Sequence, residues 1–212
     1  MLNFIAAVIF LSLFLGLILW LNSLTSTPRQ RAIAQAAEAL NADFDRWAPA
    51  PADFLAFYTL QSAQLRYLHN ALQNPSVHLF DFTTISDRGA TTQTAIILPC
   101  QRQQDGMLLA SRHPWLSTDA MTLVADQTPS QMSSDDLPPG LRNWTVLATP
   151  AHRIRQWLST EVTDWLLAHP HLHIEWAGGM LLVCQPGYLI DPAEITLVIR
   201  DVSRLRDCLS QP

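Results

Sequence analysis

The sequence contains no lysine, and all 13 of its basic residues are arginine. This absence excludes every mechanism that needs a lysine amine: a P-loop with its phosphate-binding lysine, a kinase-type ATP site, or a Schiff base to pyridoxal phosphate. The motifs HExxH and GxSxG and a glycine-rich phosphate loop are missing as well. Because no complete catalytic set is found, the sequence favours a protein that is not an enzyme, and it predicts no cofactor.

Cysteine is scarce, and positive charge is not concentrated anywhere. Cys100, Cys184 and Cys208 are odd in number, widely spaced and not part of a CxxC motif. This usage is typical of reduced cytoplasmic thiols rather than of a disulfide framework. The net charge is -5 and the arginines are scattered. A duplex-binding surface needs a basic patch that neutralises phosphates, so nucleic acid is not an expected partner.

A long apolar run opens the chain, from Phe4 to Leu21, interrupted only by Ser12 and Gly16. As a helix it would rise about 27 Å, close to the roughly 30 Å of bilayer hydrocarbon. A cleaved secretory signal would need a basic start, a shorter apolar core and a small-x-small cleavage site, none of which is present. Arg29 and Arg31 follow the run, so the positive-inside rule places the remaining chain in the cytoplasm. The sequence therefore predicts a single-pass inner-membrane protein that contacts the lipid bilayer through Phe4 to Leu21.

The rest of the chain predicts one folded domain. We expect an anchor at residues 1–25, a juxtamembrane helix and linker at 26–52, and the domain at 53–212. Residues 29–47 have helical spacing, and residues 53–73 suggest a short strand followed by a helix. Residues 77–85 and 91–98 alternate like the two strands of a hairpin, and residues 107–111 suggest a third strand.

The C-terminal third carries the clearest signals. Thr149 and Pro150 are typical of a helix start, and Gly178 and Gly179 separate two strands at 171–177 and 180–185. A last helix begins near Asp191. Strands mixed with helices and hairpins indicate an α+β fold with a mainly antiparallel sheet, amphipathic helices packed on it, and the N-terminal transmembrane helix.

Three segments resemble a loose group of uncharacterised bacterial membrane-anchored proteins with a domain of unknown function. The segments are LFDF at 79–82, QTAII at 93–97 and IEWAGGMLL at 174–182. In that group an "lFDy" strand, a "QT" strand and a "hE..gg.l" hairpin follow transmembrane helices. The resemblance implies an α+β module on a membrane, and no activity or functional residue comes with it.

A candidate metal site lies at the start of the C-terminal hairpin. Alternate residues of a strand share a face, which would bring His171, His173 and Glu175 together. If the two glycines close the hairpin, Cys184 lies opposite His173, and imidazole, thiolate and carboxylate are ligand types that zinc uses. The alternative is that Leu172, Ile174 and Trp176 form the core face and the polar residues are solvated.

Two further catalytic interpretations are open. Cys184 and His173 could be a nucleophile and its base, although a cysteine in an apolar strand usually behaves as a small hydrophobe. Asp81, between two phenylalanines, could be a general base, or it could be an edge-strand charge paired with an arginine such as Arg88.

Aromatic residues concentrate in the C-terminal third. They are core residues or, if exposed, a protein-binding surface, because aromatic side chains dominate protein interfaces. Four of the seven tryptophans lie in this third of the chain: Trp144, Trp157, Trp165 and Trp176.

Three functional hypotheses follow. The first is a membrane-anchored cytoplasmic interaction module, non-enzymatic, that binds another protein through these tryptophans. The second is a metal-binding protein or hydrolase using His171, His173, Glu175 and Cys184. The third is a small structural subunit of a larger membrane complex.

Overall fold

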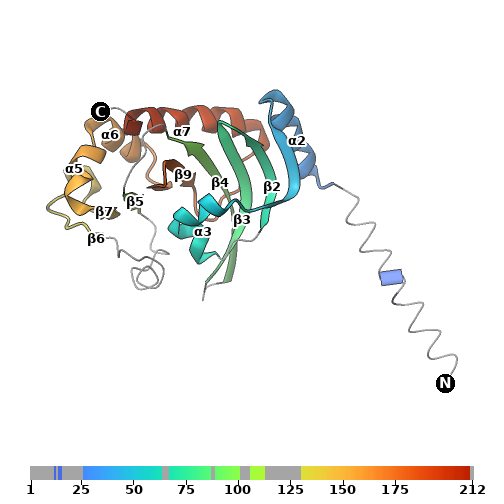
Figure 1. The fold of residues 1–212 in the computed structure, drawn as a ribbon, viewed down its shortest axis with the longest axis horizontal. Coiled ribbons are helices and arrows are strands. Elements are labelled where there is room, and N and C mark those ends of the chain that lie inside the picture. Colours follow the sequence, from blue (N-terminus) through green and yellow to red (C-terminus); the bar gives the residue numbers. More distant parts are fainter. Residues whose placement is uncertain are drawn as a thin grey trace, which may run out of the picture.

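A single antiparallel sheet organises the chain. The computed structural model describes residues 26–63, 67–86, 89–100, 106–112 and 130–210, together with residues 12, 14 and 15. In this part of the chain nine strands lie in the order β1-β2-β3-β4-β9-β8-β5-β7-β6 (Figure 1). The strands are β1 (Asp43–Pro49), β2 (Tyr67–Asn74), β3 (Val77–Ser86), β4 (Gly89–Pro99), β5 (Met107–Ser111), β6 (Ser130–Gln131), β7 (Thr145–Thr149), β8 (His173–Ala177) and β9 (Met180–Cys184).

Helices cover both faces of this sheet. The larger core joins one face to α2, α5, α6 and α7, and the smaller core joins the other face to η1 and α3. Strands covered on both sides are buried throughout, as the five residues of β8 are. The helical segments are α2 (Pro28–Ala39), η1 (Ala52–Ala56), α3 (Tyr58–Ser62), η2 (Pro139–Leu141), η3 (Ala151–Arg153), α5 (Ile154–Trp157), α6 (Thr160–Ala168), η4 (Pro192–Glu194) and α7 (Ile195–Ser210).

Local sequence signals explain the clearest elements. Helix α2 starts with a capping box, in which Thr27 and Gln30 bond reciprocally and Pro28 takes the first helical position. The β8–β9 hairpin turns at Gly178 and Gly179, whose φ values of 59° and 72° suit a two-residue turn of primed type. The predicted pairing of His173 with Cys184 across this hairpin is confirmed.

The membrane-spanning part of the predicted fold class is wrong. In the described part of the chain, no helix is long and apolar enough to cross a bilayer. The longest of these helices, α7, has 16 residues and carries charged side chains along its exposed side. The predictions of a transmembrane helix, a single-pass topology and an inner-membrane localisation are therefore wrong. The apolar run itself, Phe4 to Leu21, lies outside the described residues except for positions 12, 14 and 15.

Two local predictions near the first helix are also wrong. The helix predicted at 29–47 ends at Ala39, and the chain turns at Asn41, which has a positive φ of 48°, into β1. Residues 67–74 form strand β2 rather than the second half of a helix. Strand β2 pairs with β1 on one side and β3 on the other, so long-range pairing overrides a helix-compatible local pattern.

Candidate functional site

The predicted metal-site residues are divided between the two faces of the sheet. His171 precedes β8, is exposed, and lines a pocket beside α7. His173 and Glu175 are fully buried and contact Thr59 of α3, on the opposite face. The alternative that placed them on a solvated side is wrong, because η1 and α3 cover that face.

His173, Glu175 and Thr59 form a compact buried polar cluster. The Thr59 amide donates to Glu175 Oε1 at 3.0 Å, and the Thr59 hydroxyl donates to the same oxygen. His173 Nε2 lies 2.7 Å from Glu175 Oε1 and 3.0 Å from Thr59 Oγ1. The Thr59 amide, the Thr59 hydroxyl and the His173 ring nitrogen thus converge on one carboxylate oxygen, and hydrogen bonds to a carboxylate are stronger than those between neutral groups. The cluster attaches α3 to the centre of the sheet.

The groups around this cluster are held in their protonated forms. Burial raises the pKa of the Cys184 thiol far above its ordinary value, and the nearby Glu175 carboxylate raises it further. Burial and the same carboxylate also raise the pKa of Tyr58. Because the thiolate is the nucleophilic form of cysteine, Cys184 is inert at neutral pH. Among the described residues, no group of three or more His, Cys, Asp or Glu side chains is placed to hold a metal ion.

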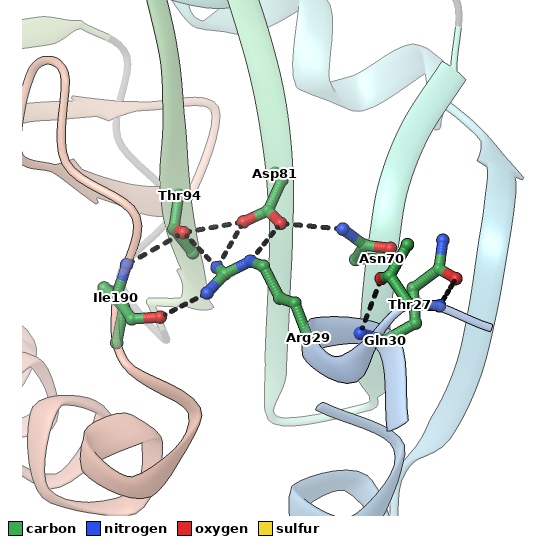
Figure 2. Close-up of polar contacts among 7 residues, drawn as sticks. All are labelled: Thr27, Arg29, Gln30, Asn70, Asp81, Thr94 and Ile190. Atoms are coloured by element: carbon green, nitrogen blue, oxygen red, sulfur yellow. Dashed lines mark hydrogen bonds and ion pairs between the residues drawn. The ribbon is translucent and has the colours of Figure 1, made fainter. Parts of the chain in front are cut away.

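Asp81 belongs to a second buried network, which sequence reasoning did not find (Figure 2). Arg29 donates through Nε and one terminal nitrogen to the two carboxylate oxygens of Asp81, both at 2.8 Å. Asn70 donates to Asp81 at 2.8 Å, and the Thr94 hydroxyl donates at 2.6 Å. Arg29 also donates to the Ile190 carbonyl at 2.7 Å.

This second network joins α2, β2, β3, β4 and the segment before α7. Asp81 is 3% exposed and accepts four hydrogen bonds, so it is fully engaged as a structural anion rather than placed as a base. The suggested partner Arg88 lies outside the described residues. Arg29 is 52 positions from Asp81 in the sequence, and no local pattern links the two.

The four tryptophans proposed as an interaction surface belong to the core. Their side chains are between 1% and 9% exposed, because helices α5 to α7 pack them against the sheet. Trp157 and Trp176 meet edge to face, with ring centroids 5.9 Å apart. They therefore offer no surface to a partner in this structure. The tryptophans that were predicted as a surface and are core residues are Trp144, Trp157, Trp165 and Trp176.

Exposed aromatic residues lie instead on the β1–β2 ribbon at one edge of the sheet. Trp47 is 60% exposed and Tyr67 is 56% exposed. Trp47 pairs across the strands with His69, and the two rings meet edge to face at 4.2 Å. Pro49 pairs with Tyr67 two positions away. We call Trp47, Tyr67 and His69 the aromatic patch.

The free backbone edge beside this patch is protected. The Asp45 side chain accepts a hydrogen bond from the Trp47 amide at 2.9 Å, and Pro49 has no amide hydrogen. Charged side chains and proline are devices that keep edge strands from pairing with other chains. Contact with another molecule at this edge would therefore use the aromatic side chains rather than added strand pairing. Sequence reasoning missed the patch because both halves of the ribbon were expected to be helical.

The comparisons with known proteins give a fold likeness. No family model matches the chain, and no curated protein matches its sequence. A solved structure, the crystal structure of the mycobacterial trehalose monomycolate transport factor A, TtfA, superposes with a TM-score of 0.58. The identity is 12%, and the match covers 88% of this chain and 98% of that one. At this identity the likeness shows a shared fold.

Proposed function

We propose that this chain is a non-enzymatic component of a transport process and that it acts by binding a protein partner through the aromatic patch. The fold it shares with a protein named as a transport factor supports the first part. The exposed Trp47 and Tyr67 carry the second part. The partner would present an apolar pocket that receives the Trp47 indole.

Energetics favour this surface. Tryptophan and tyrosine are enriched among the few residues that dominate binding energy, and truncation of such a residue costs at least about 2 kcal/mol. Trp47 lies on strand β1, which pairs in register with β2, and its ring contacts the His69 ring. Tryptophan and tyrosine have few rotatable side-chain bonds and therefore lose little conformational entropy on binding. Because the backbone groups at this edge are protected, a partner would contact the aromatic side chains of the patch.

The buried polar groups give less support to catalysis. Asp81 is saturated with donors, and Cys184 is held as a neutral thiol. His173 and Glu175 are 0% exposed, where a substrate does not reach them in this structure. Both clusters stabilise the fold, which is consistent with a binding role for the surface.

The test is capture of the partner by the full-length protein from its native source. Trp47→Ala and Tyr67→Ala are compared with wild type, and Leu167→Ala is the control because Leu167 is a similarly exposed apolar residue on α6. We expect a stoichiometric partner that is retained by the control and lost by both patch variants. With the purified partner, Trp47→Ala should weaken the Kd by about 30-fold. If Trp47→Ala bound the partner as tightly as wild type, the assignment of the aromatic patch as the binding surface would be refuted. An enzyme activity of the isolated chain would refute the proposed non-enzymatic function.

A further inference from the structure

A pocket of about 400 Å³ lies between the N-terminal half of α7, the end of β9 and the turn that precedes β8. Its inner wall includes Ile96, Val183 and Val202, which are between 0% and 3% exposed. The hollow therefore reaches from the surface to the larger core. At its mouth, Leu197 and Tyr188 are 56% and 40% exposed.

The size and the apolar wall indicate a small-molecule site. Ligand pockets typically measure roughly 300–1,000 Å³ and are lined mainly by apolar side chains with a few polar groups. Transfer of a hydrocarbon chain from water to the apolar inner wall of this pocket is favourable. A standard protein interface would need about 800 Å² on each partner, which is a broad surface rather than a hollow. The apolar side chains at the mouth continue the wall outward, as a chain-shaped ligand requires.

Charge at the rim indicates the head of this ligand. Arg200 and Arg204 line the pocket one helical turn apart on α7. Asp201 also lines it, but it is 2.9 Å from His169 Nε2 and 3.9 Å from Arg204. Glu194 stands at the amino end of α7, where the helix dipole favours a negative charge. The rim thus carries two guanidinium groups and two carboxylates, and Asp201 is already engaged by His169 and Arg204. Arg200 is the rim guanidinium that has no ion pair among the described residues, and guanidinium matches the geometry of a carboxylate.

We propose that this pocket binds a long-chain carboxylate. The hydrocarbon chain lies against Ile96, Val183 and Val202, and the carboxylate meets Arg200 and Arg204 at the rim. Binding here does not depend on the aromatic patch, which lies at the β1–β2 edge of the sheet (Figure 1).

The test uses the full-length protein in detergent-free buffer and palmitate labelled with ¹³C at its carboxyl carbon. Binding is followed by calorimetry and by the ¹³C chemical shift. We expect one palmitate per chain, and hexadecanol, which has the same chain length and no charge, should bind at least tenfold more weakly. The double variant Arg200→Gln/Arg204→Gln should lose roughly tenfold in affinity and shift the ¹³C signal. Arg206→Gln is the matched control, since Arg206 lies on α7 outside this pocket and is paired with Asp207.

Two variants test where the hydrocarbon chain of the ligand lies. Val198→Trp fills the pocket from α7 and should abolish palmitate binding. Leu197→Asp places a negative charge at the exposed mouth, so it should weaken binding at least tenfold without a change in Tm. Absence of palmitate binding, or binding that neither variant alters, would overturn the proposal. Equal binding of hexadecanol would overturn the carboxylate assignment. The aromatic patch is unchanged in all these variants, and partner capture is measured in a separate experiment. A failure of palmitate binding is therefore distinguishable from a failure of partner binding.

Discussion

Replacing Arg29 with methionine tests the network that joins α2 to the sheet. Methionine keeps an unbranched side chain and removes the guanidinium. The change eliminates the bidentate contact with Asp81 at 2.8 Å and the bond to the Ile190 carbonyl at 2.7 Å. Asp81, 3% exposed, then keeps only Asn70 and Thr94 as donors. A buried carboxylate that loses its counter-charge is strongly destabilising.

The magnitude follows from burial. Breaking a fully buried ion pair costs about 3–5 kcal/mol. The Arg29 side chain is 23% exposed, and Asp81 retains two donors, so we expect a loss of about 2–3 kcal/mol in the free energy of unfolding. For a domain of this size, that loss corresponds to a fall in Tm of roughly 4–12 °C.

Urea unfolding of the full-length protein measures this loss, and hydrogen exchange shows whether α2 opens first. Arg31→Met is the matched control, because Arg31 is exposed on the same helix; we expect a change within about 0.5 kcal/mol. A double-mutant cycle with Asp81→Asn should give a coupling energy of at least about 1 kcal/mol. An Arg29→Met variant as stable as the control, or a coupling energy near zero, would refute the reasoning.

Two further stability predictions concern other buried groups. Glu175→Ala removes the oxygen that accepts from the Thr59 amide and hydroxyl and contacts the His173 ring, so urea unfolding should show a loss of about 3–5 kcal/mol in the free energy of unfolding. The control Glu38→Ala, at an exposed position of α2, should change the stability little. A loss below about 1 kcal/mol for Glu175→Ala would contradict the proposed role of the cluster. Burial raises the pKa of the Cys100 thiol from 9.0 to about 11. As the pH rises, the thiol of the unfolded chain therefore ionises before the buried thiol of the folded chain. The contribution of the neutral Cys100 thiol to the free energy of unfolding is present below about pH 9 and is lost as the pH rises through about 11. Cys100→Ala should flatten the decline of the urea midpoint over that range, and slopes that stay parallel to wild type would contradict the assignment.

Elements with strong local signals could be predicted from the sequence. Gly178 and Gly179 can adopt positive φ without strain, which identified the β8–β9 hairpin and its register. Asp191 and Pro192 marked the start of the helical segment that becomes η4 and α7. In both cases the decisive interactions lie within a few residues of one another, so a short window of sequence contains them.

Elements stabilised by distant partners could not be predicted. Strand β2 has a helix-compatible pattern and becomes a strand because β1 and β3 flank it. His173 and Glu175 alternate with apolar residues, which is typical of a half-exposed strand. They are buried because η1 and α3, more than 100 positions earlier, cover that face. Burial on both faces is a property of the whole fold, and alternation within one strand does not reveal it.

The two buried carboxylates have a common role on opposite faces of the sheet. Asp81 is held by Arg29 at the start of α2, and Glu175 by Thr59 in α3. Apolar packing alone would allow either helical segment to slide, because hydrophobic contact is non-directional. A buried carboxylate accepts hydrogen bonds from fixed directions and is costly to leave unpaired, so it defines one position for the segment that covers it. The acidic residues that looked most like catalytic groups in the sequence therefore fix the two covering layers, and neither belongs to the aromatic patch or to the pocket that we propose as binding surfaces.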